Sequence, residues 1–434
     1  MKQSKFRETE IGKIPESWEI KSISDVSEIY LGGTPMTTVK EYWDGDIKWA
    51  SAKDVASCSS RYIHETERKI TQKGVENSAA KILPKNTLVI TSRGTVGKIA
   101  LLPEPMSFNQ TCYGLKARKE VSPLYLYYKL KDSVARFESV SYGTVFETIT
   151  IRTFEELKIS IPAFSEQLNI IKILSDLDSK IELNNEMNKT LEAIGQALFK
   201  HWFVDFEFSN EKGKPYKSSG GEMVDSELGE IPKGWSVREI KDCGEVVCGK
   251  TPSTRQKDNY GDDIAFITIP DMRNQIFVVT TGRKLSHVGA KSQKKKELPP
   301  LSVCVSCIAT PGLVSLTYKR SHTNQQINSI LCNENIDPYL MYYFMVNKSD
   351  QIKTMGLGGT ATLNLNTGDF SKIKVIVPAK IDMLGFGKLI HPIFDGILGN
   401  VEESLNLSKI CDSLLPRLMS GRIRVKDLTK KLNG

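Results

Sequence analysis

The sequence lacks most of the residue patterns that accompany catalysis or metal binding. Histidine occurs only five times in 434 residues, and the lone Cys304-Val-Ser-Cys307 segment has no second Cys or His pair to complete a zinc site. It contains neither a GxSxG nucleophile turn nor the Asn/Asp-Pro-Pro-aromatic element expected of an enzyme that methylates base amino groups. We therefore expect no catalytic residues and no bound metal.

The sequence also lacks a signal peptide and a membrane-spanning run. No apolar segment follows the basic residues of the N-terminal MKQSKFRETEIGK. The least polar stretch, Leu301 to Leu316, is interrupted by Ser, Thr, Pro and Gly and is too short to cross a bilayer. Eight cysteines without a secretory signal are typical of reduced thiols, so we expect a cytoplasmic protein. The net charge of +8 permits a polyanionic partner without establishing one.

What the sequence does contain is an internal repeat, which sets the architecture before any local prediction. Both halves carry an Ile-Pro-x-x-Trp opening, a Gly-x-Thr-Pro turn, an Asn-Gln pair and a late Gly-Thr pair. In order, these are Ile14 to Trp18 and Ile231 to Trp235, Gly32 to Pro35 and Gly249 to Pro252, Asn109-Gln110 and Asn324-Gln325, and Gly143-Thr144 and Gly359-Thr360. One repeat is a globular domain followed by a long helix, and the chain holds two.

Residues spaced alternately by four and three predict the two helices, each with one narrow apolar seam. The first seam is Ile170, Leu174, Leu177, Ile181, Asn184, Asn188, Leu191, Gly195 and Leu198; the second is Ile390, Ile393, Ile397, Asn400, Ser404, Leu407, Cys411 and Leu414. We expect the helices to pair antiparallel, with Asn184 meeting Asn400 and with Asn188 and Ser404 beside that crossing. The alternative is that these polar positions face solvent. Pro392 and nearby glycines predict that the second helix begins near Pro392.

Short apolar runs between turn residues predict a mixed α/β (α+β) fold in each globular domain. Strands are expected at 87–91, 99–102, 157–161, 303–308, 314–318 and 373–377, and helices at 124–138 and 339–352. The predicted organisation is two globular domains at 1–163 and 226–380, two long helices at 164–208 and 381–421, a polar linker at 209–225 and a basic, partly disordered tail at 422–434.

Residues Gly244 to Thr251 satisfy the phosphate-loop expression GxxxxGK[ST]. A working loop must open an amphipathic helix, so that the helix N-terminus can hold phosphate. The segment that follows begins at Pro252, is polar and is rich in helix breakers. We therefore interpret the match as accidental.

Residues 55–80 and 272–297 share little between the repeats, whereas the scaffold around them recurs. Two domains with different recognition surfaces would show this contrast, and so would unconstrained loops. Basic and polar side chains in these segments and at the repeated turns suit phosphates and base edges. The candidate DNA contacts are Thr34, Lys40, Tyr42, Lys53, Arg61, Arg68, Arg93, Gln110, Thr144, Lys250, Thr251, Arg255, Gln256, Lys257, Arg273, Lys291, Gln325 and Thr360. For any single residue, a solvated basic surface is the alternative.

Several of these features together resemble the specificity (S) subunit of type I restriction-modification systems. They are the helix ending Ala197-Leu-Phe-Lys-His-Trp-Phe-Val-Asp-Phe206, the second helix ending at Leu414 to Val425, the Ile-Pro-x-x-Trp openings and the Gly-x-Thr-Pro turns. The similarity covers nearly the whole chain, in the right order and twice over, so it is far more specific than any single motif.

The resemblance implies a non-catalytic subunit for defence against foreign DNA in a prokaryotic cytoplasm. Each globular domain would be a target recognition domain for one half of a bipartite, asymmetric site in double-stranded DNA, and the antiparallel coiled coil would set the gap. Two modification (methyltransferase) subunits, which methylate adenine N6 with S-adenosylmethionine, would dock on it, together with ATP-dependent restriction (motor-nuclease) subunits. S-adenosylmethionine, ATP and Mg would belong to those partners, and this chain would bind no cofactor.

The residues expected to form the coiled coil or a subunit interface come from the seams and the helix ends. They are Leu174, Leu177, Ile181, Asn184, Leu191, Leu198, Trp202, Phe203, Phe206, Ile393, Ile397, Asn400, Leu407 and Leu414. The resemblance implicates Trp202, Phe203 and Phe206, with Leu415, Met419 and Ile423 as counterparts, in packing at the helix–domain junction or against a modification subunit. Two rival functions remain: a stand-alone DNA-modifying enzyme and a protein-binding assembly scaffold.

Overall fold

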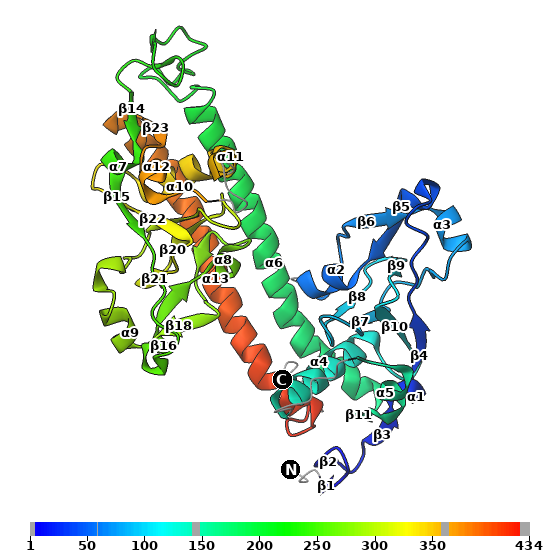
Figure 1. Ribbon diagram of the computed structural model, residues 1–434. Coiled ribbons are helices and arrows are strands. Elements are labelled where there is room, and N and C mark those ends of the chain that lie inside the picture. Colours follow the sequence, from blue (N-terminus) through cyan, green and yellow to red (C-terminus); the bar gives the residue numbers. More distant parts are fainter. Residues whose placement is uncertain (1–4, 59, 141–147, 357–363, 426–434) are drawn as a thin grey trace, which may run out of the picture. The chain divides into compact units, whose positions relative to one another are not determined.

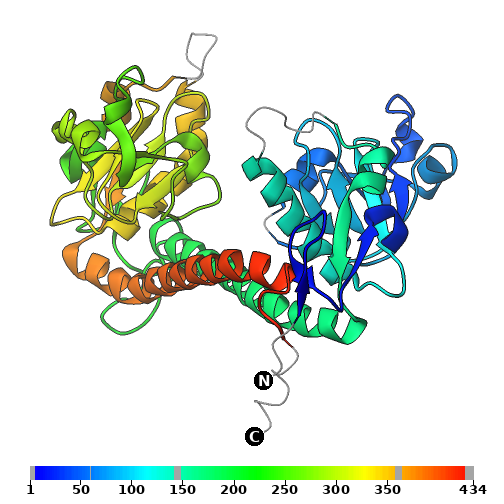
Figure 2. The same ribbon diagram turned by 90° about the horizontal axis from the view of Figure 1, so that it is seen from below.

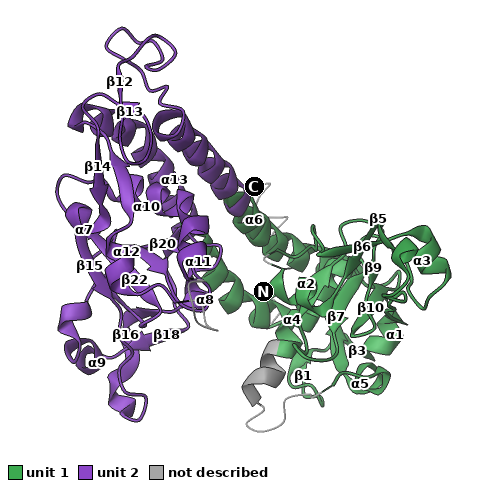
Figure 3. Ribbon diagram, turned by 45° about the horizontal axis from the view of Figure 1, so that its top comes forward, with its two compact units in different colours: residues 1–184, 403–434 green, residues 185–402 purple. Residues whose placement is uncertain are grey.

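The computed structural model describes residues 5–58, 60–140, 148–356 and 364–425, and its elements follow the repeat twice (Figure 1). The chain forms two compact units, unit 1 with residues 1–184 and 403–434 and unit 2 with residues 185–402 (Figure 3). Each unit therefore contains one globular domain and a segment of both long helices. Within each unit the globular domain lies on one side of those helix segments (Figure 2). Both domains have the predicted mixed α/β fold.

Each repeat contributes a matching series of strands and helices. The first is β1 (Phe6–Arg7), β2 (Ile14–Pro15), β3 (Glu19–Ser22), α1 (Ile23–Val26), β4 (Ser27–Leu31), η1 (Lys40–Tyr42), β5 (Trp43–Ala50), α2 (Ala52–Ser57), β6 (Arg68–Ile70), α3 (Gln72–Glu76), β7 (Leu88–Thr91), β8 (Ile99–Leu101), β9 (Ser107–Phe108), β10 (Cys112–Ala117), α4 (Pro123–Val140), α5 (Ile151–Glu156), β11 (Lys158–Ile161) and α6 (Phe164–Phe203). The second is β12 (Met223–Val224), β13 (Ile231–Pro232), β14 (Ser236–Glu239), α7 (Ile240–Cys243), β15 (Gly244–Cys248), η2 (Lys257–Asn259), β16 (Tyr260–Ile267), α8 (Ile269–Met272), β17 (Phe277–Val278), β18 (Arg283–Leu285), α9 (His287–Lys291), η3 (Lys294–Lys296), β19 (Val303–Ser306), β20 (Val314–Thr317), β21 (Ser321–Thr323), β22 (Ile327–Cys332), α10 (Pro338–Asn347), α11 (Ser349–Gly356), α12 (Thr367–Ser371), β23 (Lys374–Val377) and α13 (Lys380–Met419).

Apart from two-stranded pairs, each domain contains two sheets, whose strand order is the same except that β17 is added at one edge of the larger sheet in the second domain. The larger sheet is β4-β10-β7-β8 in the first domain and β15-β22-β19-β20-β17 in the second. The smaller sheet is β6-β5-β9 in the first and β18-β16-β21 in the second, and its middle strand pairs antiparallel on one side and parallel on the other. The segments that diverge in sequence therefore share β6–α3 and β18–α9, and the second domain adds β17 and η3.

The predicted helix at 339–352 is two helices, α10 and α11, which meet at Lys348. Asp337 caps α10 by accepting hydrogen bonds from the backbone N–H groups of Tyr339 and Leu340, and Pro338 occupies the first turn, where it has no helical hydrogen bond to lose. The apolar periodicity continues across the break, so it predicted one helix where the backbone makes two.

α13 begins at Lys380 and continues through Pro392, contrary to the predicted start near Pro392. A proline inside a helix costs about 3 kcal/mol because one hydrogen bond is lost and the ring crowds the preceding turn. Phe386, Ile390 and Phe394 around it are fully buried. Burying each such side chain contributes roughly 1.5–3 kcal/mol, so packing outweighs the cost of the proline.

Both helix ends differ slightly from the predicted bounds. α6 ends at Phe203, before the predicted position 208, and α13 ends at Met419. The start of the predicted disordered tail is packed on unit 1, where Arg424 pairs with Glu166 and Val425 is buried. Residues 426–434 of that tail lie outside the described residues.

Candidate functional site

The repeated Gly-x-Thr-Pro turn and Asn-Gln pair, which are distant in sequence, meet in each domain. Thr34 Oγ1 donates a hydrogen bond to Gln110 Oε1, and Thr251 Oγ1 donates one to Gln325 Oε1 over 2.6 Å. The structure thus brings four of the predicted DNA contacts together as two equivalent pairs. Thr144 and Thr360, from the late Gly-Thr pairs, lie outside the described residues.

Most of the predicted basic contacts are exposed. These are Lys40, Lys53, Arg68, Arg93, Lys250, Arg255, Lys257, Arg273 and Lys291, together with the neutral Gln256; Tyr42 is half-buried. Lys53 pairs with Glu67 over 2.8 Å, and the Arg68 guanidinium lies 3.3 Å from the Trp43 ring centroid. The other cations form no ion pair with any described residue. Their charges are therefore available to a polyanion, and DNA contact by each stays a prediction.

When the elements of the two domains are matched, two basic residues of the first domain have a basic residue at the equivalent position of the second. Lys40 opens η1 in the first domain, and Lys257 opens η2 in the second. Arg68 and Arg283 likewise begin β6 and β18. Sequence comparison missed the second pair because the repeats slip by two residues between the turn and these strands.

An open pocket of about 590 Å³ in the second domain is lined by Lys257, Tyr260, Arg283 and Lys284 among others. It lies where η2, β16 and the segment before β18 meet. Lys284 is partly neutralised by Asp262 at 3.6 Å, whereas Lys257 and Arg283 form no ion pair with a described residue. The pocket combines cations with an aromatic ring, which suits the phosphates and bases of a nucleic acid.

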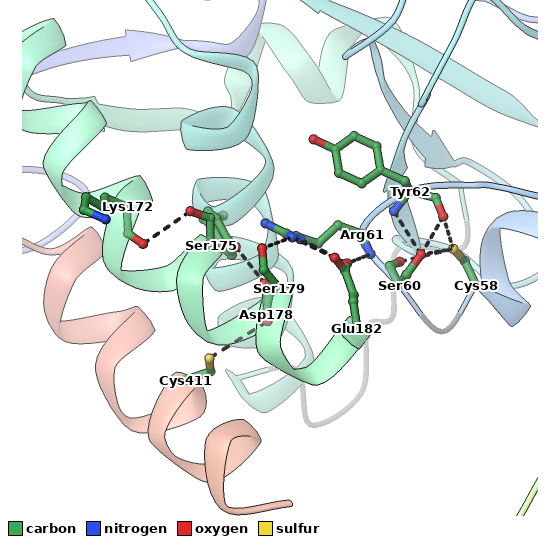
Figure 4. A network of polar contacts seen from close by, with 11 residues as sticks. Cys58, Ser60, Arg61, Tyr62, Lys172, Ser175, Asp178, Ser179, Glu182 and Cys411 are labelled. Carbon is green, nitrogen blue, oxygen red and sulfur yellow. Dashed lines mark hydrogen bonds and ion pairs between the residues drawn. The ribbon is translucent and has the colours of Figure 1, made fainter. Parts of the chain in front are cut away.

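Arg61 was predicted to contact DNA, and the structure contradicts this. Its side chain is buried and donates hydrogen bonds to both carboxylate oxygens of Glu182, at 3.1 and 2.7 Å, and to Ser179 on α6 (Figure 4). Burial alone would raise the pKa of Glu182, but the hydrogen bonds from Arg61 outweigh it and lower that pKa. Arg61 therefore fastens the first domain to α6 and has no exposed charge to offer DNA.

The same junction is polar in unit 1 and aromatic in unit 2. In unit 1, Tyr128 donates a hydrogen bond to Asp178 over 2.7 Å. The Cys411 thiol lies 3.9 Å from the same carboxylate (Figure 4). In unit 2, Phe394 occupies the position of Asp178 and stacks on Tyr339 with ring centroids 4.0 Å apart. Sequence analysis missed this contrast because it considered only the seam positions, and neither Phe394 nor Asp178 is one of them.

The helix-end aromatics pack into the domain that their helix reaches. In unit 2, Phe203 and Phe206 are buried in the core, and Trp202 packs on Phe386 with ring centroids 5.7 Å apart. The counterparts in unit 1 behave alike: Leu415 and Met419 are buried in its core, and Ile423 packs against it. Of the two roles left open by the sequence, packing at the helix–domain junction fits these buried side chains.

Each opening tryptophan is anchored by an acidic residue from the start of the following helix. Trp18 Nε1 donates to Glu166 over 3.2 Å, and Trp235 Nε1 donates to Asp382 over 2.8 Å. Glu166 also accepts hydrogen bonds from Arg424. Asp382 forms no ion pair within the described part of the chain, and burial raises its pKa above the usual 3.8.

The seam residues are buried or half-buried, and the polar ones bond across the two helices. In unit 1, Asn184 is fully buried and donates to Glu403 and Ser404 over 2.9 and 3.2 Å. In unit 2, Asn400 donates to Asn188 over 2.8 Å. In each unit the numbers rise along one helix as they fall along the other, so the predicted antiparallel pairing is confirmed and the solvent-facing alternative is wrong for Asn184. Asn184 and Asn400 belong to different units, and their predicted meeting stays a prediction.

The remaining motifs carry no site. Gly244 to Cys248 form strand β15, and the residues after it form a turn and η2 instead of the long helix that a phosphate loop requires. Cys304 and Cys307 pack into separate core clusters, as expected for opposite faces of a strand. Within the described ranges, no group of three or more His, Cys, Asp or Glu could hold a metal ion, and no helix is long and apolar enough to cross a membrane.

Comparison with known proteins places both repeats in one family. Residues 15–193 and 232–393 match the family model described as Type I restriction modification DNA specificity domain. The chain is 31% identical over 434 residues to the MjaIX specificity subunit of Methanocaldococcus jannaschii, covering 98% of each protein. It is 40% identical over 334 residues to the HindI specificity subunit of Haemophilus influenzae, covering 65% of this chain and 72% of that protein.

A solved structure shares the fold at lower identity. The crystal structure of the type I restriction-modification S subunit from M. genitalium aligns with a TM-score of 0.52 and 16% identity, covering 92% of this chain and 96% of that one. The family model matches the two repeats separately, as the internal repeat requires. The chain therefore belongs to the family of type I restriction-modification DNA specificity subunits.

Proposed function

We propose that this chain selects the DNA sequence for a type I restriction-modification enzyme, with each globular domain reading one half of a bipartite, asymmetric site. The observation that carries the proposal is that equivalent elements present different exposed side chains in the two domains. The last residue of α3 is Glu76, whereas the last residue of α9 is Lys291. At the turn position before the repeated Thr, the second domain presents the exposed Lys250, whereas the first has Gly33, which is buried and has no side chain. One scaffold with two surfaces suits two different half-sites.

The long helices supply the remaining part of the proposal. They set the gap between the half-sites and carry the docking surfaces for two modification subunits and for the restriction subunits. α6 and α13 each contain 40 residues, which corresponds to about 60 Å at 1.5 Å per residue. Half-sites on one face of a duplex lie about 34–36 Å apart, so helices of this length can span the gap. S-adenosylmethionine, ATP and Mg belong to the partner subunits in this proposal.

A domain exchange tests which part of the chain reads DNA. Residues 226–380 are replaced by the corresponding domain of a related specificity subunit, and the methylated positions in the host genome are sequenced. We expect one half-site to change while the other half-site is retained. If the methylated sequence stayed the same, the domains would bind protein and the scaffold alternative would hold.

A second assay separates a specificity subunit from a stand-alone DNA-modifying enzyme. The purified chain is incubated with duplex DNA and labelled S-adenosylmethionine, with and without the modification subunits. We expect methyl transfer only when those subunits are added. Transfer by the chain alone would establish the enzyme alternative.

A further inference from the structure

The turn that carries the repeated Thr is kept in both domains although different side chains support it. In the first domain, the indole N–H groups of Trp43 and Trp49 donate to Met36 O and Gly33 O at 3.2 and 2.9 Å. In the second, Tyr260 Oη donates to Pro252 O and Asn259 Nδ2 donates to Ser253 O, at 2.8 and 3.1 Å. The supporting residues have changed while the turn itself has not. What the two domains share is the turn itself and its contact with the Asn-Gln segment.

The turn is pressed onto the Asn-Gln segment so closely that its first residue must be glycine. A Cβ on Gly32 or on Gly249 would lie 2.1 Å from the backbone oxygen of Asn109 or Asn324, respectively. Each of these asparagines also accepts a hydrogen bond from the backbone N–H two residues ahead, at 3.2 and 3.1 Å. In each domain this hydrogen bond joins the residue before the glutamine to the residue after it, and so fixes the backbone on both sides of the glutamine.

At this turn the glutamine oxygen is already hydrogen-bonded, whereas its amide nitrogen bonds to no described residue. Its Oε1 accepts the hydroxyl of Thr34 in the first domain and of Thr251 in the second. Gln110 and Gln325 are both exposed, and neither Nε2 group bonds to another described residue. A free glutamine can turn either its oxygen or its nitrogen toward a ligand, but the hydrogen bond to threonine orients the amide and leaves its two N–H donors without a partner among the described residues.

We infer that Gln110 and Gln325 each donate a hydrogen bond to a DNA phosphate and so position their domains on the duplex. The inference rests on the proposed function, in which the two domains read different half-sites. A side chain held identically in both domains cannot distinguish those half-sites. Phosphate oxygens accept hydrogen bonds, recur at every nucleotide and fix register without carrying sequence. Base reading then belongs to neighbouring exposed positions that differ, such as Lys250, whose equivalent in the first domain is the buried Gly33.

Replacing both glutamines with glutamate tests the inference. In Gln110→Glu/Gln325→Glu, an oxygen remains for the threonine hydroxyl and the shape is nearly unchanged, but a negative charge takes the place of the N–H donors. The full chain, assembled with its modification subunits, is titrated onto duplex DNA that carries its site. We expect the double variant to bind about a hundredfold more weakly, or about tenfold per contact, and to methylate the same sequence.

Two control variants accompany the double variant. Gln351→Glu introduces one such negative charge at an exposed position that bonds Lys348 instead of a turn threonine, and it should leave binding within about twofold. Thr251→Val keeps the turn's shape but frees the amide to rotate, and it should weaken binding by only a few fold. Thermal unfolding is measured for every variant, so that a folding defect is separated from a lost contact.

The possible results separate this inference from the proposed function. If the wild-type complex binds DNA and the folded double variant binds it equally well, the phosphate contact is overturned. The proposed function is not affected by that result. A change in the methylated sequence also overturns it, because the glutamines would then read bases. If the wild-type complex does not bind duplex DNA, the proposed function fails and the inference fails with it.

Discussion

Glu166 and Asp382 occupy the same position in the two repeats, but only Glu166 has a cationic partner among the described residues. Glu166 lies between Trp18 and Arg424, whereas Phe208 stacks on Trp235 beside Asp382 with ring centroids 5.0 Å apart. Burial raises the pKa of Asp382 because the charged carboxylate is separated from water. We therefore expect that neutralising these two equivalent carboxylates changes the stability of the protein in opposite directions.

Asp382→Asn is expected to stabilise the protein at neutral pH by about 1 kcal/mol, because asparagine keeps an oxygen for Trp235 and removes a half-buried charge. A carboxyl whose pKa is raised by folding loses stability as the pH rises from 3.8 through the folded pKa. The advantage of the variant should thus be full at pH 7 and shrink on acidification. Thermal unfolding midpoints measured from just below pH 3.8 up to pH 8 check both statements.

Glu166→Gln is the matched control and should act in the opposite direction. It leaves Arg424 without its carboxylate in a largely buried setting, which should cost about 2–3 kcal/mol. Equal effects of the two variants on the unfolding midpoint would contradict the difference between the two anchors.

The role of Arg61 could not be predicted from the residue and its sequence neighbours. Its charge and its place in a divergent segment favoured DNA contact, but its partner, Glu182, lies 121 residues away on α6. No local pattern relates the two positions, so an ion pair and a free cation look the same in the sequence. The Thr–Gln pairs were more accessible to prediction because each pair occurs twice at corresponding positions.

Among the elements, the long helices were the most predictable because the spacing of their apolar residues is a local property. The start of α13 was not predictable in this way. Pro392 is a strong local signal, whereas the aromatic packing that overrides it involves Tyr339 and Phe277 from the second domain. At α13 the local effect of the proline opposes a helix, whereas packing against residues distant in sequence favours one, and the packing contributes more.

Pro392→Ala should therefore stabilise α13 by about 1–2 kcal/mol, because it restores a backbone donor inside a helix that is already formed. The gain is smaller than the full cost of a helical proline because alanine increases the freedom of the unfolded chain. Thermal unfolding measures the effect. Pro392→Gly should gain about 1 kcal/mol less, and a lower midpoint for the alanine variant would argue against the packing explanation.

The polar seam residues are expected to set helix register at a cost in stability. Replacing Asn188 and Asn400 together with leucine exchanges a hydrogen-bonded pair for an apolar one. We expect the unfolding midpoint to rise while methylation tolerates a wider range of gaps between half-sites. Sequencing methylated genomic positions reports the gap, and Leu407→Ile serves as a seam control without a change of polarity. A gap as strict as that of the wild type would refute a register role for this pair.

For the whole molecule, the repeat predicted two similar domains and their order because the scaffold residues recur in the sequence itself. No recurring residues in the sequence indicated which segment of each long helix belongs to which unit. The boundaries between the units, after Asn184 and after Glu402, fall inside α6 and α13. Each helix completes the core of a different domain at each of its ends, and only the packed chain shows this.

One consequence concerns a chain that stops at Glu402. It would retain all of unit 2 but lose residues that unit 1 buries: Leu415, Leu418, Met419 and Val425. We expect protease to degrade the first domain of a 1–402 fragment while residues 226–402 resist, as judged by mass spectrometry of the digest. Equal resistance of both domains would show that unit 1 does not need its C-terminal segment.

Unit 2 is continuous in sequence, whereas unit 1 is built from both ends of the chain. Domains usually mature in the order in which the ribosome releases them, but for this chain we expect the reverse order. The second domain can finish its core as soon as Glu402 has emerged. The first domain, although made earlier, needs the segment after Glu402 to complete its core. We therefore expect a chain terminated before that segment to expose an unfinished first domain to quality-control proteases.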